Sequence, residues 1–392
     1  MTGPAATGEK PPFDPSVTVD WWLAPRQIFD GDALRDGLAL RISSKRIAAV
    51  SPASEAGADG APVWRTECLA TPGFFDVQIN GGGGVLFNTT PTVEGLAAIA
   101  AAHRATGTTA FLPTLITDAP EVMDNAVSAA IAAHGRFGVA GIHLEGPHIS
   151  IERKGAHNPA FIRPIDEHTF SIVARLRTAG LPVLVTLAPE CVPAGTIVRL
   201  CAMGAVVSLG HTAADGKTVR AAISEGATSA THLFNGMTPM TSREPGVVGA
   251  ALDSGIYCGF IADGHHVDDT VLRVAIRARP RGDRMVLVSD AMPTWNGPDH
   301  FELYGETIRV VGGRLVNRIG SLAGVHIDMA TSLKRLVEQV GIRIDGALPM
   351  ATAAPASLMG LQGEIGALRQ GVRADIVLLD RELKCCAVIL AT

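Results

Sequence analysis

The chain has 392 residues, of which 47% are hydrophobic and 18% are charged. This length and composition are enough for one large barrel or two domains, and they exclude a wholly disordered chain. The formal net charge of −5 and the pI of about 6.2 exclude a global positive field of the kind that attracts nucleic acid. A small anionic substrate could still bind through local groups.

The cysteines and the N-terminal sequence indicate a cytoplasmic protein without a membrane segment. The six cysteines are scattered and form no CxxC pair, which is typical of a reduced chain. The first residues lack the basic and then apolar pattern of a signal peptide. No run reaches the roughly 18 apolar residues that a membrane-spanning helix needs.

The N-terminal part of the chain predicts a flexible tail followed by a small sheet. Residues 1–15 carry no structural pattern, and we expect them to be a loose tail. Between residues 16 and 70 short β-like runs alternate with turns, and we expect strands at Val17–Val19, Leu38–Ile42 and Arg46–Val50.

From residue 71 onward, short apolar strands alternate with helical stretches. The eight strand candidates span residues 74–80, 109–115, 141–145, 183–187, 206–210, 229–233, 257–262 and 285–289, with helix-like segments at 92–105, 121–134, 166–179 and 216–226. This repeated alternation predicts an α/β fold, a (β/α)₈ TIM barrel over residues 71–340. A doubly wound open sheet is the alternative, but no G-x-G-x-x-G sequence opens the first helix.

The C-terminal part returns to β-like patterns. Residues 306–316 resemble a hairpin that turns at Gly312 and Gly313, residues 329–340 and 348–359 are helical in pattern, and residues 366–380 predict strand-turn-strand. We therefore expect residues 341–392 to supply a closing helix and the second part of a small β-sandwich-like domain, built from both chain ends.

Three side chains at strand ends predict a metal site. Glu145, His211 and His232 each stand at the end of a strand candidate, and the carboxyl ends of barrel strands face one cavity. A carboxylate at the end of a buried strand is costly without a positive partner. Catalytic zinc commonly has three protein ligands and one water. The alternative is that each of the three is an ordinary buried residue with its own hydrogen-bond partner.

Four further residues are candidates for catalysis or anion binding. Asp290 follows the eighth strand and could act as a general base, or could cap a helix beginning at Ala291. His157 could polarise a substrate carbonyl, or could be a surface histidine. Arg243 and His266 could hold an anion, or could be solvated.

Eight segments in order carry a resemblance to a known family: PGFFDVQINGGGG, HLEGPHIS, KGAHNP, SLGHTAAD, ATHLFNGM, TSREPG, IADGHHVD and VSDAM. Together they resemble the N-acetylglucosamine-6-phosphate deacetylases of the amidohydrolase superfamily, over residues 72–324. The resemblance implies that Glu145, His211 and His232 bind the metal and that Asp290 is the catalytic acid and base. It implies that His157 contacts the acetyl carbonyl.

The resemblance also implies how the substrate is held. Asn235 and Gly236 would approach a phosphate through their backbone, and Arg243 and His266 would hold it by charge. Ala156 and Leu322 would contact the substrate, the latter in a stretch that lines the acetyl pocket. A homodimer is implied, in which Arg243 would be supplied across the interface.

One departure from the superfamily limits the metal content. Many members have His-x-His on the first strand and bind two metals, whereas this chain has Gln78 and Asn80. Neutral amides are poor zinc ligands beside imidazole, so we expect one divalent metal per chain, zinc. The activity implied is hydrolysis of N-acetylglucosamine 6-phosphate to glucosamine 6-phosphate and acetate by a metal-activated water. The alternatives are an amidohydrolase for N-acetylgalactosamine 6-phosphate or for a non-phosphorylated amide, and a non-catalytic scaffold.

Overall fold

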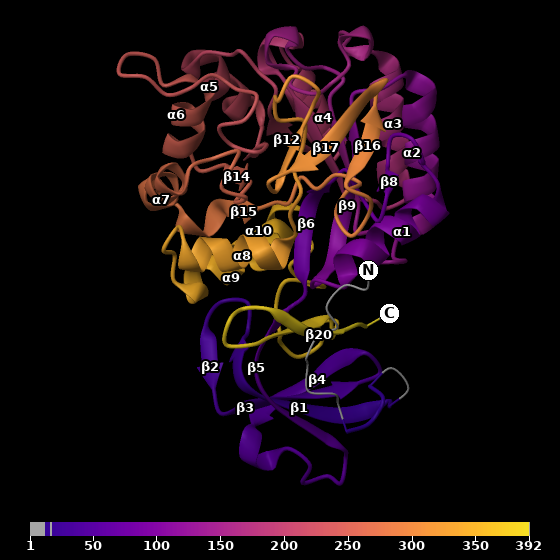
Figure 1. Ribbon diagram of the computed structural model, residues 1–392, viewed down its shortest axis with the longest axis vertical. Coiled ribbons are helices and arrows are strands. Elements are labelled where there is room, and N and C mark those ends of the chain that lie inside the picture. Colours follow the sequence, from indigo (N-terminus) through magenta and orange to yellow (C-terminus); the bar gives the residue numbers. More distant parts are fainter. Residues whose placement is uncertain (1–11, 16–17, 392) are drawn as a thin grey trace.

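The computed structural model describes residues 12–15 and 18–391. Figure 1 shows a large part in which helices surround strands, and a smaller sheet below it that contains both indigo and yellow segments, from the two ends of the chain. No helix in the described ranges is long and apolar enough to cross a bilayer. The predicted tail over residues 1–15 lies mostly outside the described residues.

Eight parallel strands form the large part. In sheet order they are β15 (Met285–Leu287), β14 (Tyr257–Phe260), β13 (Ser229–Ala230), β12 (Val206–Leu209), β11 (Val183–Leu187), β10 (Ile142–Glu145), β9 (Thr108–Ile116) and β6 (Phe74–Ile79). The two ends of this order meet, because the backbone N–H of Asp290 donates to the carbonyl of Gln78 at 2.9 Å and Ile79 bridges Ala291. The predicted barrel and all eight of its strands are confirmed.

Helices connect the strands and cover the barrel. They are α1 (Val93–Arg104), α2 (Pro120–Ala133), α3 (Glu167–Thr178), α4 (Thr196–Ala202), α5 (Gly216–Glu225), α6 (Gly246–Asp253) and α7 (Asp269–Ala278). The sequence patterns had not predicted α4, α6 or α7. Side-chain oxygens at the N-caps of α1, α3, α5 and α7 accept a backbone N–H of the first turn, which satisfies donors that the helix leaves free.

The smaller sheet joins the two chain ends. Its strands are β1 (Asp20–Phe29), β2 (Leu34–Asp36), β3 (Leu38–Ser43), β4 (Arg46–Pro52), β5 (Val63–Pro72), β19 (Ile376–Leu379) and β20 (Cys385–Ile389). β19 pairs antiparallel with β5, so the expected pairing of both ends is present. Along β1 the side chains alternate between two apolar clusters, with Trp21 and Leu23 in one and Trp22 and Ala24 in the other.

Three local predictions need correction or fall outside the described residues. Residues 366–380 hold one strand rather than two, because Val372 donates back to Arg369 in a turn and the partner of β19 is β20. The predicted helix over 348–359 is two helices, α9 (Ile344–Ala351) and α10 (Ala353–Leu358), and Pro355 cannot donate the bond that would join them. The strand predicted at residues 17–19 lies partly outside the described residues, and β1 begins at Asp20.

Two features after the eighth strand complete the barrel. A three-stranded sheet of β16 (His300–Leu303), β17 (Glu306–Val311) and β18 (Arg314–Val316) contains the predicted hairpin. Its orange strands β16 and β17 are drawn in front of the barrel strands in Figure 1. α8 (Met329–Glu338) follows, and α8–α10 lie between the barrel and the small sheet.

A short hairpin, β7 (Gly81–Gly82) with β8 (Val85–Leu86), extends the end of β6. The domain limits at residues 70 and 340 stay predictions.

Candidate active site

Glu145, His211 and His232 lie together at the carboxyl ends of their strands. Glu145 Oε1 is 3.1 Å from His211 Nε2 and 2.9 Å from His232 Nε2, and the two imidazole nitrogens are 3.0 Å apart. All three side chains are buried, with 2–6% of their surface exposed. Three donor atoms at these distances can coordinate a single metal ion.

The hydrogen bonds around the three residues fit a cation. His211 Nδ1 lies 2.8 Å from the carbonyl oxygen of Arg153, which can only accept, so Nδ1 carries the proton. In the neutral imidazole, Nε2 then presents its lone pair to Glu145 Oε1. Two facing lone pairs repel each other unless a positive charge lies between them. The donor set of one carboxylate and two imidazoles is suited to a divalent metal such as zinc.

The local electrostatics favour an ionised Glu145. Burial acts to raise the pKa of Glu145, but the close contacts with the imidazoles of His211 and His232 outweigh it and hold the pKa well below its usual value. Burial likewise acts to lower the pKa of His232, and Glu145 raises it above its usual value. A negative charge is therefore maintained where a cation would bind.

Backbone conformation turns these side chains into the barrel. His211, His232 and Asp290 follow the ends of their strands and have φ of 48°, 30° and 51°, in the left-handed region. Non-glycine residues adopt this region at a cost, and such strain gathers at functional sites. Gly236 also has a positive φ of 58°, and a Cβ there would lie 2.9 Å from His211 Nδ1, so a side chain would displace the candidate ligand.

Asp290 is held beside the three residues by two amides. Asn80 Nδ2 and Gln78 Nε2 donate to Asp290 Oδ1 at 2.6 and 3.1 Å, and Gln78 Nε2 also lies 3.3 Å from Glu145 Oε1. Burial and then the charge of Glu145 raise the pKa of Asp290 to about 6. The residues that directly follow Asp290 form a turn and no helix, so the alternative role as an N-cap is wrong.

His157 is buried, which overturns the alternative of a surface histidine. Only 4% of its surface is exposed, and its ring centroid lies 4.3 Å from that of His211. The backbone N–H and the hydroxyl of Thr117 lie 3.3 and 2.7 Å from His157 Nδ1. Sequence reasoning had missed Thr117, although its position directly after β9 is where barrel residues reach the cavity.

A cavity of about 240 Å³ collects nearly all of the predicted site residues. Its lining includes the three candidate ligands together with Asp290, His157, Ala156, Asn235, Gly236, His266 and Leu322. Ile116, Ile261 and Met292 also line it and were not predicted. Apolar residues at strand ends resemble ordinary core residues in sequence, and only their place in the barrel reveals them.

The two candidate anion ligands have different surroundings. His266 lines the cavity, and its Nδ1 donates to Asp263 Oδ2 at 2.6 Å. Burial acts to raise the pKa of Asp263, but its bond to His266 and the charge of His266 outweigh burial, and the pKa falls to about 2. Arg243 is exposed, in the segment between β13 and α6, and does not line this cavity. The structure therefore does not bring Arg243 together with the other candidates within one chain.

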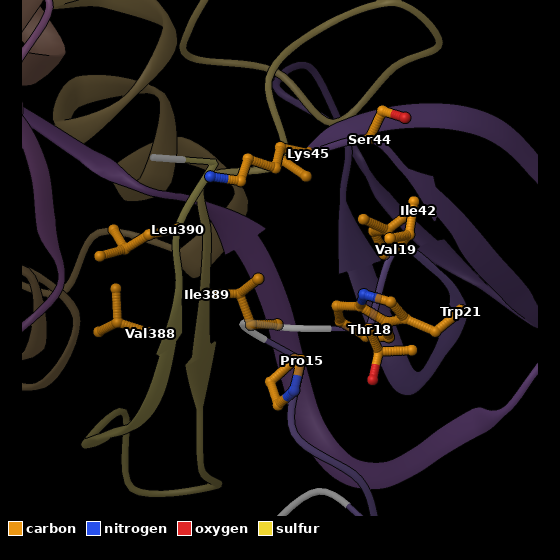
Figure 2. Close-up of a pocket in the computed structure, with 11 residues that line it drawn as sticks. Pro15, Thr18, Val19, Trp21, Ile42, Ser44, Lys45, Val388, Ile389 and Leu390 are labelled. Carbon is orange, nitrogen blue, oxygen red and sulfur yellow. The ribbon is translucent and has the colours of Figure 1, made fainter.

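A larger cavity of about 470 Å³ lies against the small sheet. Figure 2 shows Trp21, Ile42 and Ile389 among its lining, with Lys45 at its edge. Lys45 is the one charged side chain among the lining residues, and they include no histidine or carboxylate. The described lining of this cavity offers no metal ligand and no cluster of titratable groups, so we assign the site to the barrel cavity.

Both the sequence and the structure are similar to those of known proteins, and the sequence matches a known protein family. The model of the Amidohydrolase family matches residues 69–390. The chain belongs to the amidohydrolase family.

Among the relatives of this amidohydrolase are deacetylases of phosphorylated amino sugars. It is 43% identical over 323 residues to the N-acetylgalactosamine-6-phosphate deacetylase of Shewanella sp. (strain ANA-3), covering 81% of each chain. It is 38% identical over 343 residues to the N-acetylglucosamine-6-phosphate deacetylase of Homo sapiens, covering 81% of this chain and 82% of the relative. The crystal structure of N-acetylglucosamine-6-phosphate deacetylase from Pasteurella multocida matches with a TM-score of 0.90 at 32% identity, covering 95% of this chain and 98% of that one.

Proposed function

We propose that this amidohydrolase hydrolyses the acetamide of N-acetylglucosamine 6-phosphate, releasing glucosamine 6-phosphate and acetate. The observation that carries the proposal is the meeting of one carboxylate, two imidazoles and a separate aspartate in one cavity. Deacetylases of phosphorylated amino sugars among the relatives support the choice of substrate. A non-catalytic scaffold would have no need to keep this buried polar set, which is costly without a ligand.

The metal would be held by Glu145, His211 and His232, and we propose one zinc ion per chain. When bound, it would polarise the acetyl carbonyl and lower the pKa of a water molecule. Gln78 and Asn80 lie close to Asp290 rather than to a second set of imidazoles, which supports a single ion.

The chain's own residues would carry the proton and orient the substrate. Asp290 Oδ1 is occupied by two amide donors, so Oδ2 is the oxygen left to accept a proton from the attacking water and to return it to the amine. His157 would donate a hydrogen bond to the acetyl oxygen as negative charge develops there.

The phosphate would be bound at the other side of the cavity. The hydrogen bond from His266 Nδ1 to Asp263 Oδ2 fixes the orientation of the His266 ring, which lines the cavity and would face the phosphate. Asn235 and Gly236 would present their backbone, while Ala156 and Leu322 would pack against the sugar and its acetyl group.

Arg243 would complete the phosphate site from a second protomer. Its exposed position, away from the cavity of its own chain, is compatible with a homodimer in which each protomer lends this arginine to its partner. We also propose a cytoplasmic location, because the six cysteines, all in the described part of the chain, are free thiols.

N-acetylgalactosamine 6-phosphate is the second candidate substrate. The observation that favours it is the relative at 43% identity, whose name specifies the galacto epimer. The two sugars differ only at one hydroxyl, so the same metal and base would serve both.

An acetate-release assay on the two N-acetylated 6-phosphates tests the proposal. We expect turnover of the gluco epimer that is lost on chelation and restored by zinc. A higher kcat/KM for the galacto epimer would favour the second candidate. Turnover of neither, or turnover that does not change when the phosphate is removed, would contradict the assignment to phosphorylated amino sugars.

A further inference from the structure

The hydrogen bonds at His157 define which of its nitrogens carries the proton. The backbone N–H of Thr117 points at Nδ1 with a nitrogen-to-nitrogen distance of 3.3 Å. A backbone N–H can only donate, so Nδ1 must present its lone pair to it. In the neutral ring the proton is then on Nε2.

The hydroxyl of Thr117 strengthens this arrangement. Thr117 Oγ1 lies 2.7 Å from His157 Nδ1 and 3.4 Å from the carbonyl oxygen of Glu145. The hydroxyl has a single proton, and because Nδ1 already accepts from the backbone N–H, that proton goes to the nearer Nδ1 rather than to the carbonyl. Thr117 is fully buried, so water does not compete for these bonds. The carbonyl of Thr117 accepts a bond from Tyr304 Oη at 2.9 Å, which ties the segment to the turn between β16 and β17.

The opposite side of the ring is available to a substrate. His157 lines the cavity beside the candidate metal ligands, and no described residue accepts a bond from its Nε2. A neutral imidazole with Nε2–H facing the cavity can donate a hydrogen bond to a substrate without first taking up a proton.

We propose that Thr117 is a positioning residue that holds His157 in the Nε2–H tautomer, with that proton directed at the acyl oxygen of the substrate. This inference rests on the proposed deacetylase function for the identity of the substrate, but the tautomer itself follows from the backbone N–H of Thr117 that donates to Nδ1. The contribution is to the transition state, in which the acyl oxygen gains negative charge, so it affects kcat more than KM.

The first test needs no substrate. Protein labelled with ¹⁵N-histidine is examined as purified by long-range ¹H–¹⁵N correlation, and the His157 signals are identified by their loss in His157→Asn. We expect the pattern of a neutral ring protonated at Nε2. A ring protonated at Nδ1, or at both nitrogens above pH 7, would overturn the proposal whatever the enzyme acts on.

The second test is a pair of substitutions at Thr117. Thr117→Val keeps the shape and the backbone N–H but loses the hydroxyl, and we expect kcat to fall about tenfold with KM changed less than about twofold. Thr117→Ser keeps the hydroxyl, and we expect it to restore most of kcat. A kcat for Thr117→Val within about twofold of wild type, or an equal loss in Thr117→Ser, would contradict the positioning role.

Thr71→Val is the matched control. Thr71 is also fully buried at the end of a strand, in β5, but its Oγ1 has no hydrogen-bond partner. We expect no change in kcat there.

If wild type turns over neither sugar phosphate, the proposed function fails, while the tautomer seen by NMR still decides the role of Thr117.

Discussion

At the scale of single residues, Asp290 shows how a buried carboxylate can be held in place while one of its oxygens stays without these donors. Asn80 and Gln78 donate to the same oxygen, Oδ1, which fixes the side chain and leaves Oδ2 without these donors. The buried carboxylate of Asp76 accepts hydrogen bonds from the backbone N–H groups of Gln78 and Ser289. The backbone of Gln78 and the backbone just before Asp290 are therefore held by the same carboxylate.

Asp290→Asn tests the base. The amide has nearly the same shape but cannot accept the proton of the attacking water, so we expect kcat to fall on the order of 10³-fold. Zinc content should stay at one per chain, because Asp290 is not among the three clustered donors. Asp299→Asn, at an exposed position, is the control. Substantial turnover in Asp290→Asn would remove Asp290 from the mechanism.

Asn80→Ala tests how the pKa of Asp290 is set. Burial raises the pKa of Asp290 to about 6, and the bond from Asn80 is one of the effects that lower it, because it stabilises the charged form. Losing that bond should raise the pKa. Since the base must be ionised, the acid limb of the kcat profile should move to higher pH, which a pH–rate series measures. A limb that stays in place or moves to lower pH would show that Asn80 does not act on Asp290.

At the scale of elements, α1 is tied to the end of β6 by a buried histidine. His103, in the last turn of α1, lies with Nε2 2.9 Å from the carbonyl of Gly81, and 1% of its surface is exposed. A Cβ on Gly82 would come within 2.8 Å of that nitrogen, so the helix can approach this closely only because position 82 is a glycine. This contact supports the strand that carries Gln78 and Asn80.

His103→Gln should make stability less sensitive to acid. Burial lowers the pKa of His103 from 6.5 to about 4, so the unfolded chain binds the proton first as pH falls. The stabilisation is therefore complete above pH 6.5 and is lost between 6.5 and 4, about 2 kcal/mol of it between pH 7 and 5. Gln keeps a donor for Gly81 but does not titrate, so urea unfolding at the two pH values should show a smaller loss. An equal loss in both proteins would contradict this.

At the scale of the whole molecule, we expect metal binding and folding to be linked, because the three candidate ligands come from strands that meet only in the closed barrel. Zinc at roughly 100 times its dissociation constant should add about 2.7 kcal/mol to the free energy of unfolding and raise Tm. His211→Gln should abolish most of this rise, whereas His265→Gln, at an exposed position, should keep it. Equal zinc-dependent shifts in both variants, measured by calorimetry, would place the metal elsewhere.

Mixing two inactive variants tests the dimer. If Arg243 acts on the partner's cavity, a mixed dimer of Asp290→Asn and Arg243→Ala chains contains one cavity with both a normal Asp290 and a normal arginine. Equal mixing after reversible dissociation should then restore roughly a quarter of the wild-type rate. No recovery in dimers shown to have exchanged would mean that Arg243 acts within its own chain or not at all.

The sequence by itself determined the barrel and named the candidates for its site. Alternation of apolar strands with helices is a local property, and the residue at each strand end follows from it, which is why Glu145, His211, His232 and Asp290 could be named in advance. Helix α6 was missed because nearly all of its residues are apolar and buried, so no amphipathic stripe distinguishes it from a buried strand.

Only the tertiary structure decided how these residues act on one another. The 3 Å spacing of the donor atoms, the two amides on Asp290 Oδ1 and the bond from the Thr117 backbone to His157 join residues from 21 to 212 positions apart. The same holds for the pairing of β5 with β19, which unites the chain ends. Such contacts depend on barrel closure and on the direction of individual N–H groups, and neither is encoded in a local pattern of residues.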